Sequence, residues 1–261
     1  MDFGLGGKTA LLVGGASGIG LETARLLARE GAAVTLADLN GDGAAQAAEA
    51  LNKEGLSADG LAVDITQPES VDAMAERVLQ ARGGVDILIN CAGIAGDKLF
   101  VDSEPEDWMA EINVNLVGPM LCAKAVLPGM IERQGGRILT VASDSARIGQ
   151  ARLSYYAASK AGAIAFCKSL AQEVGRHSIT VNVVSPGATN TPLRVEREEG
   201  IRQSLGERAY AERVEKVLRR YPLRRLGEPG DVAAALVFLA GERASWITGQ
   251  VLSVNGGFTM P

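Results

Sequence analysis

The sequence predicts an α/β protein with one doubly wound parallel sheet, and three observations favour this fold class. Short apolar runs alternate with helical patterns along most of the chain, as strands alternate with helices in a parallel sheet. Aromatic residues make up only 4% of the 261 residues, whereas 32 residues are glycine, which suits tight turns between strands and helices. Glycine or small polar residues follow several apolar runs, at the strand ends where such sheets bind ligands.

The expected elements follow in order along the chain. Strands are expected at 9–13, 33–37, 61–63, 85–89, 137–141 and 180–184, and helices at about 21–29, 42–53, 68–81, 106–133 and 157–170. The helical region at 106–133 is expected to be interrupted at Gly118-Pro119 and at Pro128. No repeat, low-complexity segment or linker interrupts this alternation. Residues 1–261 are therefore expected to form a single domain.

Composition excludes several classes of function. A formal net charge of −5 does not favour nucleic acid or an anionic membrane as a partner. The three cysteines, at 91, 122 and 167, have apolar neighbours and no metal-ligand spacing, so no metal site is expected. His177 is the only histidine and lies in a short polar turn, which argues against a Ser-His-Asp triad. No signal pattern begins the chain and no apolar run approaches 18 residues, so a soluble cytoplasmic protein is expected.

A glycine-rich turn joins the first expected strand to the first helix. The segment reads Gly14-Gly15-Ala16-Ser17-Gly18-Ile19-Gly20. Glycines let the backbone approach a pyrophosphate, and a helix N-terminus offers free N–H groups and a positive dipole end. The spacing is Gly-x3-Gly-x-Gly rather than the commoner G-x-G-x-x-G, so the turn predicts a dinucleotide site only together with its context.

The end of the second expected strand supplies that context. Asp38 lies 18 residues after Gly20, where a carboxylate can accept hydrogen bonds from the adenosine ribose. The same carboxylate repels a 2′-phosphate, and its neighbours Ser17 and Leu39 offer no cation, so NAD is expected rather than NADP. Polar or turn residues at the other strand ends are expected at the same edge of the sheet; these are Asp64, Asn90, Ser143 and Pro186.

Tyr156 and Lys160 form the candidate acid–base pair. They are four residues apart on an expected helix, so their side chains leave the same face. A positive charge at ~4 Å in an effective dielectric of ~20 would favour the phenolate by about 4 kcal/mol. Before desolvation subtracts its share, this attraction would lower the tyrosine pKa from ~10 toward roughly 7, which suits general acid–base catalysis.

Taken together, these motifs resemble the short-chain dehydrogenase/reductase family, whose members have a Rossmann-like sheet and a nicotinamide cofactor. The resemblance runs from about residue 6 to residue 258. Its motifs are the glycine-rich turn, Asn90-Cys91-Ala92-Gly93, Asn113-Val114-Asn115-Leu116, Ser143, Tyr156-x3-Lys160, Pro186-Gly187, the segment 226–232, and 249–257. Four positions depart from the pattern without removing a catalytic atom: Val13, Cys91, Ala142 and Asn255.

The resemblance implies roles for individual residues. Tyr156 would exchange the proton with the substrate oxygen, Ser143 would hydrogen-bond that oxygen, Lys160 would hold the nicotinamide ribose, and Asn115 would keep a water in a proton relay. The resemblance and the strand-end argument together place the cofactor against Gly14, Ser17, Gly18, Ile19, Gly20, Asp38, Leu39, Asp64, Ile65, Asn90, Ala92, Gly93, Tyr156, Lys160, Pro186, Gly187 and Thr191.

The segment at about 190–225 would be the helical lid over the substrate. Its residues 192–225 hold nine arginines and one lysine against six glutamates, a local charge of +4. Either these charges form a solvated helix face, or they attract an anionic substrate such as a hydroxy acid or a coenzyme A thioester. In the second case, Arg147 and Arg152, between Ser143 and Tyr156, would bind substrate together with those two residues.

The sequence therefore predicts an oxidoreductase that transfers a hydride between NAD and a secondary alcohol or ketone, possibly a hydroxy acid or hydroxyacyl-CoA. Two alternatives remain: an NADPH-dependent 3-oxoacyl carrier-protein reductase, and a non-catalytic NAD-binding subunit of a hetero-oligomer. The apolar, small-residue-rich helices near 115–130 and 156–174 favour a homotetramer, as is usual in the family. A small-molecule substrate is the other expected partner.

Overall fold

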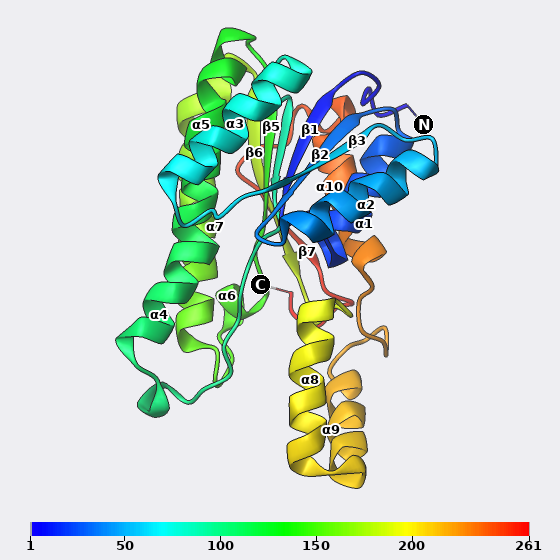
Figure 1. Ribbon diagram of the computed structural model, residues 1–261. Helices are drawn as coiled ribbons and strands as arrows, with labels where there is room; N and C mark the ends of the chain where they lie inside the picture. The colour runs from blue at the N-terminus through cyan, green and yellow to red at the C-terminus, as the bar shows by residue number, and fades with distance from the viewer. Residues whose placement is uncertain (1, 261) are drawn as a thin grey trace.

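The computed structural model describes residues 2–260. Seven parallel strands form one sheet in the order β3-β2-β1-β4-β5-β6-β7 (Figure 1). The strands are β1 (Thr9–Val13), β2 (Ala33–Asp38), β3 (Ala58–Ala62), β4 (Ile87–Asn90), β5 (Gly136–Val141), β6 (Ile179–Pro186) and β7 (Val251–Val254). The order reverses between β1 and β4, which places the topological switch point there. This is the predicted fold class, a Rossmann-like doubly wound sheet.

The sheet has a helical layer on each face. On one face, α1 (Gly18–Arg29), α2 (Gly41–Lys53) and α10 (Pro229–Ala240) pack against the inner side chains of β1, β2 and β4. On the other, α3 (Pro68–Arg82), α5 (Gly118–Glu132) and α7 (Ser154–Val174) form a second core with β1, β4, β5 and β6. Because both faces are covered, the central strands are continuous apolar runs rather than alternating ones.

Two strands differ from the prediction. The third strand was expected at 61–63 but covers Ala58–Ala62, where Asp59 and Gly60 interrupt the apolar pattern. The pairing of Val34 with Ala58 and of Asp38 with Ala62 fixes this register through the backbone rather than through side-chain hydrophobicity. The short strand β7 was not predicted, because its four residues are half-buried or exposed and show no strong pattern.

The long helix expected at 106–133 is one continuous helical rod with a change of winding. It comprises α4 (Pro105–Ile112), a π-helical turn η2 (Asn113–Val117) and α5. By length and composition this rod could cross a membrane, with a mean hydropathy of 1.5 over 18 residues, of which 39% are buried. The expectation concerned uninterrupted apolar runs, and it is not contradicted, because Asn115 and Lys124 interrupt the apolar sequence of this rod. Core helices meet the same criterion.

The lid at 190–225 contains α8 (Pro192–Leu205) and α9 (Glu207–Arg219), which project below the sheet as a helical hairpin (Figure 1). Its two ends are held together, because the Asn190 N–H donates to the Gly227 carbonyl at 2.8 Å. Tyr221 follows the end of α9 and is buried against the cleft.

Short helices complete the chain between these elements. They are η1 (Phe100–Asp102), α6 (Ser145–Ile148), η3 (Gly175–His177) and η4 (Glu242–Ala244). The α6 turn matters most for the site, because it follows Ser143 directly and leads toward α7.

Candidate active site

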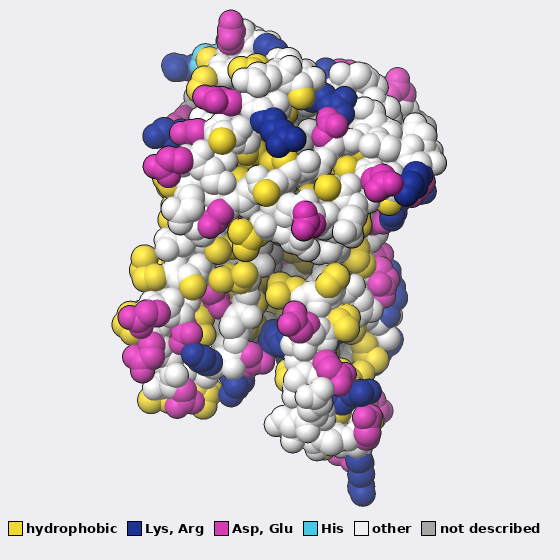
Figure 2. Space-filling model, in the orientation of Figure 1, with side chains coloured by type: hydrophobic (Ala, Val, Ile, Leu, Met, Phe, Trp, Pro, Cys, Tyr) yellow, Lys and Arg dark blue, Asp and Glu magenta, His cyan; other side chains and the backbone are white. Residues whose placement is uncertain are grey.

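A cleft of about 550 Å³ lies at the carboxyl ends of the strands. In the space-filling view, the region between the α4 side and the lid is a notch in the molecular surface (Figure 2). Most of the predicted site residues line the cleft, and they come from every part of the sheet. They are Gly14, Ser17, Gly18, Ile19, Gly20, Asp38, Leu39, Asp64, Ile65, Ala92, Gly93, Ser143, Tyr156, Lys160, Pro186, Gly187 and Thr191.

The glycine turn has no room for side chains. Gly14 has a φ of +79°, and a Cβ built there would overlap the Ala92 backbone, with the Ala92 Cα at 2.6 Å. A Cβ on Gly20 would collide with the Gly14 carbonyl oxygen. The turn therefore holds bare backbone and the start of α1 against the cleft, and this cradle fits the pyrophosphate of a dinucleotide.

Asp38 is fixed by the backbone around it. Its Oδ2 accepts a hydrogen bond from the Ala16 N–H at 3.0 Å, and its Oδ1 accepts one from the Asn40 N–H at 3.1 Å. The carboxylate thereby joins the end of β2 to the glycine turn. Among the residues lining the cleft, the only cations are Lys160, Arg194 and Arg197, and all three belong to α7 or the lid. The Asp38 end of the cleft is thus acidic and has no cation of its own.

The side chains of Asp64 and Asn90 contact neighbouring residues of the protein. The Asp64 carboxylate accepts from the N–H and the hydroxyl of Thr66, at 2.9 and 2.7 Å, closing a turn after β3. Asn90 does not line the cleft: it is buried, its Nδ2 lies 3.5 Å from the Thr140 Oγ1, and its Oδ1 has no partner within the described residues. It points toward the neighbouring strand β5.

Tyr156 and Lys160 lie on the first turns of α7, beside Ser143 at the end of β5. The Lys160 ammonium donates to the Val141 carbonyl at 2.9 Å rather than to the phenol. Burial lowers the pKa of Lys160 to about 8, while Cys91 and Glu111 oppose that shift. Burial raises the pKa of Tyr156, and a hydrogen bond with Ser143 partly offsets the increase.

The expected lowering of the tyrosine pKa by Lys160 is therefore wrong for the protein without cofactor. The argument from the four-residue spacing left desolvation to be subtracted, and here desolvation outweighs the attraction, because burial opposes the charged form of both groups. The Cys91 thiol, beside Lys160, shows the same effect, since burial raises its pKa to about 12. All three cysteines are free thiols; Cys91 is half-buried, whereas Cys122 and Cys167 are buried.

Asn115 lies behind the cleft on the π-helical turn and is completely buried. Its Oδ1 accepts from the Ile94 N–H at 3.0 Å, and its Nδ2 donates to the Ile94 carbonyl at 2.9 Å and to the Ser159 hydroxyl at 3.1 Å. A Cβ on Gly93 would lie 3.0 Å from the Asn115 Oδ1 and 3.1 Å from the Lys160 Nζ. Asn115 thus holds the strand-end loop beside Lys160.

A buried carboxylate supports Ser143 from behind. Asp144 accepts from the Ser185 hydroxyl at 2.8 Å and from the Asn255 Nδ2 at 2.6 Å. Burial raises the pKa of Asp144, and these two donors oppose the increase. Because Asn255 also holds the final turn of the chain, Asp144 links the Ser143 loop to β6 and to the segment that carries Phe258 into the cleft.

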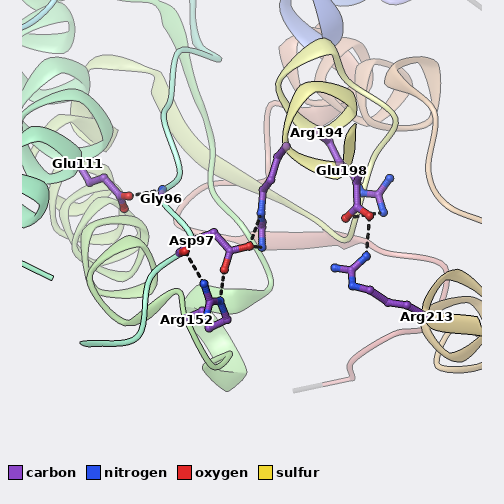
Figure 3. Close-up of polar contacts among 8 residues, drawn as sticks. Gly96, Asp97, Glu111, Arg152, Arg194, Glu198 and Arg213 are labelled. Atoms are coloured by element: carbon purple, nitrogen blue, oxygen red, sulfur yellow. Dashed lines mark hydrogen bonds and ion pairs between the residues drawn. The ribbon is translucent and has the colours of Figure 1, made fainter. Parts of the chain in front are cut away.

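Arg147 and Arg152, expected to bind substrate, do not line the cleft. Arg147 donates to the Ser253 hydroxyl on β7 at 2.5 Å. Arg152 binds Asp97 through its Nε and donates from Nη2 to the Asp97 carbonyl at 2.7 Å (Figure 3). Both guanidinium groups are thus held by protein acceptors, and a substrate role for them remains a prediction.

Two lid arginines line the cleft, although the sequence does not predict them as site residues. Arg194 and Arg197 lie on α8, and each forms an ion pair, with Glu198 and Asp97 respectively. The sequence shows only that the lid is rich in charge. Several other lid arginines pair with glutamates three or four residues away, as a solvated helix does; these include Arg202, Arg208 and Arg219. Gln150, Leu153, Tyr221 and Phe258 also line the cleft without a distinctive sequence signal.

An open parallel sheet with a glycine turn, a strand-end carboxylate and a Ser-Tyr-Lys set in one cleft defines a dinucleotide-binding oxidoreductase. A family model described as Enoyl-(Acyl carrier protein) reductase matches residues 14–259. The chain belongs to the short-chain dehydrogenase/reductase family. As a member of this family it is an enzyme that binds a nicotinamide dinucleotide and catalyses an oxidation or reduction.

Relatives match over almost the whole chain. The sequence is 39% identical over 256 residues to the 3-oxoacyl-[acyl-carrier-protein] reductase FabG of Vibrio cholerae, covering 98% of this chain and 99% of that one. It is 38% identical over 254 residues to the (2S)-[(R)-hydroxy(phenyl)methyl]succinyl-CoA dehydrogenase subunit BbsD of Thauera aromatica, covering 97% of both. The solved structure titled "Crystal structure of gox2181" is 33% identical, with a TM-score of 0.91, covering 98% of this chain and 97% of that chain.

Proposed function

We propose that the enzyme is NAD-dependent and interconverts the hydroxyl and the ketone of an acyl thioester. The observation that carries the choice of NAD is Asp38. Its carboxylate is held by two backbone N–H groups at the glycine turn, at an end of the cleft without a lysine or arginine. A 2′-phosphate carries nearly two negative charges, so placing it beside this carboxylate costs several kcal/mol at an effective dielectric of about 20.

The bound dinucleotide would supply the hydride, and the chain's own residues would move the proton. Tyr156 carries the proton to or from the substrate oxygen, and Ser143 hydrogen-bonds the same oxygen and holds the ketone in place. Lys160 is neutral or charged close to physiological pH, with a pKa of about 8, so it can pass a proton as well as hold a ribose hydroxyl.

The names of the relatives support the thioester. The reductase FabG acts on a 3-oxoacyl group on a carrier protein, and BbsD is a dehydrogenase of a hydroxy-substituted succinyl-CoA. Both names describe an oxygenated acyl group on a thiol carrier. We therefore favour a 3-hydroxyacyl or 3-oxoacyl thioester over a simple alcohol. The 3-oxoacyl carrier-protein reductase considered from the sequence is the second candidate, and the FabG relatives favour it.

The test compares the two cofactors on one thioester substrate. We expect kcat/KM with NADH to exceed that with NADPH by about 100-fold, because the carboxylate repels the phosphate by several kcal/mol. In Asp38→Ala the ratio falls at least about 10-fold, whereas Asp42→Ala, an exposed carboxylate on α2, leaves it unchanged. Equal efficiency with both cofactors in the unmutated enzyme would refute NAD dependence and favour the reductase candidate.

The same proposal includes a homotetramer that acts in the cytoplasm. In the rod of α4 and α5, only 39% of the most apolar window is buried within this chain, and Met109 and Met120 are exposed. Such an apolar surface is typical of a subunit interface. Light scattering at micromolar concentration measures the assembly, and a purely monomeric mass would contradict it.

A further inference from the structure

Two carboxylates in or beside the lid are each shared by two arginines. Asp97, in the loop after β4, accepts from Arg197 Nε at 2.9 Å and Nη2 at 2.7 Å, and also binds Arg152. Glu198, on α8, pairs with Arg213 at 2.6 Å and with Arg194 at 3.3 Å (Figure 3). Each group of two arginines and one carboxylate keeps a net charge of +1.

In each of these two groups, one of the two arginines lines the cleft, so the net positive charge of the group lies next to the cleft. Arg194 and Arg197 both line it, while their partners Asp97, Glu198 and Arg213 do not. Arg197 uses two of the five N–H donors of a guanidinium on Asp97, and it has no other hydrogen bond within residues 2–260. Donors therefore remain at the cleft for an incoming acceptor.

The position of Arg197 relative to the reacting groups limits which anion can bind. Its positive charge acts on the Tyr156 phenol and favours the phenolate, against the effect of burial. Arg197 and Tyr156 also line the same cleft, so an anion held by Arg197 would share that cleft with the substrate carbon that reacts. The phosphates of a pantetheine carrier are at the far end of a long arm from that carbon, whereas a carboxylate on the acyl chain is only a few bonds away.

We infer that Arg197, assisted by Arg194, forms a binding site for a carboxylate on the acyl part of the substrate, so that the enzyme prefers acidic acyl thioesters. This inference rests on the proposed thioester function and names its substrate class. The carboxylate would accept from the free N–H donors of Arg197 while Asp97 keeps the guanidinium in place. Held in this way, the substrate is oriented with its oxygen at Ser143 and Tyr156.

The test uses three matched substrates with saturating NADH. One is a 3-oxoacyl N-acetylcysteamine thioester whose chain ends in a carboxylate, the second is its methyl ester, and the third is the coenzyme A thioester of the same methyl ester. N-acetylcysteamine carries no phosphate, so only the third compound tests a phosphate. A charge-assisted hydrogen bond is worth about 1.5–3 kcal/mol, so we expect kcat/KM for the acid to exceed that for its methyl ester at least about 10-fold.

Three variants sharpen the comparison. In Arg197→Gln the ratio of acid to ester falls to about 1, mainly through KM for the acid, and Arg197→Lys, which keeps the charge without the fork, gives an intermediate ratio. Arg208→Gln removes a lid arginine that lies outside the cleft and is 94% exposed, so it keeps the ratio of the unmutated enzyme. A ratio near 1 in the unmutated enzyme, or one that survives Arg197→Gln, overturns the inference.

Two further outcomes are distinguished. If the coenzyme A ester alone is favoured and Arg197→Gln removes that preference, the anion is a phosphate and the assignment to the acyl chain is wrong. If no thioester is reduced, the proposed function fails, and calorimetry on the complex with NADH tests the site alone. Glutarate should then bind at least about 5-fold more tightly than neutral glutaramide, and only in enzymes that retain Arg197. Equal binding would refute the site.

Discussion

The two ends of the cleft are made in different ways. At the glycine turn, the cofactor end is formed by bare backbone, and its one charge, Asp38, is held by backbone N–H groups. At the lid, the substrate end is formed by long side chains whose charges pair across the cleft or along a helix. The comparison indicates that the backbone at the glycine turn holds a single carboxylate in place, whereas the lid end of the cleft is formed by several long side chains that can be exchanged independently.

The largest expected effect is the loss of kcat when Tyr156, in the cleft between the glycine turn and the lid, is replaced. Tyr156→Phe keeps the ring but removes the proton carrier, so we expect kcat to fall at least about 100-fold. Binding of NADH, measured by fluorescence titration, should remain close to that of the unmutated enzyme. Tyr155→Phe is the matched control, because Tyr155 is buried on the same turn of α7 but does not line the cleft. Turnover by Tyr156→Phe near the wild-type rate would exclude the proposed mechanism.

Two glycine-to-alanine variants test whether the close backbone packing at the cofactor end matters more than the backbone conformation in the lid. Gly14 and Gly206 have nearly the same positive φ, +79° and +76°, but a Cβ overlaps the Ala92 backbone at the first and meets nothing within 4 Å at the second. Gly206→Ala should cost about 1–3 kcal/mol of unfolding free energy, because a φ of 76° with a ψ of 160° is a conformation that almost only glycine adopts. Gly14→Ala should cost more and also weaken NADH binding. Equal losses in chemical denaturation would show that the backbone contact does not matter.

The smallest effect concerns the base of the lid. Arg225 donates two hydrogen bonds to Asp231 on α10, at 2.6 and 2.8 Å, and they lower the pKa of Asp231 to about 2. A lowered carboxyl pKa stabilises the folded state above the unfolded value of 3.8, and this contribution is lost as the pH falls toward 2. The pair is partly exposed, so Asp231→Asn should cost no more than about 1 kcal/mol at pH 7.

That difference should shrink below pH 4 and vanish near pH 2, as measured by urea denaturation across this range. Asp231 also accepts from the Glu228 N–H at the start of α10, and asparagine can keep that bond. Arg225→Gln separates the two contributions, since it removes the ion pair and leaves the cap. A loss in Asp231→Asn that stays constant from pH 7 to pH 2 would contradict this assignment.

The cofactor end of the cleft could be predicted from the sequence more completely than the lid end. The sheet, the glycine turn, Asp38 and the set of Ser143, Tyr156 and Lys160 could be predicted, because each depends on local patterns and on the rule that strand ends converge. The direction of Asn90 and the acceptor of Lys160 could not, since a motif gives a position but not where the side chain points. The strand β7 was missed because four half-exposed residues carry too little pattern.

The contacts between the lid and the rest of the chain could not be predicted, because they join residues that are far apart in the sequence. Arg197 and Asp97 are 100 residues apart in the chain, and nothing in either neighbourhood indicates the other. The local pairs in the lid, such as Arg208 with Glu212, follow the helical spacing that the sequence does show. The alternative of a solvated charged helix therefore describes α9 well, while the cleft side of α8 differs from it.

The π-helical turn at Asn113–Val117 has a consequence for how this site tolerates change in length. A π turn holds one more residue than the α-helical turn it replaces, and each residue of a helix corresponds to a rotation of about 100°. Deleting a single residue there would give a more regular helix, but it would turn α4 relative to α5 and carry Asn115 away from Ile94 and Ser159. The extra residue of the π turn thus sets the rotation of α4 relative to α5. A regular α-helix at this position would lose the contacts of Asn115, and we expect it to lower the activity of the enzyme.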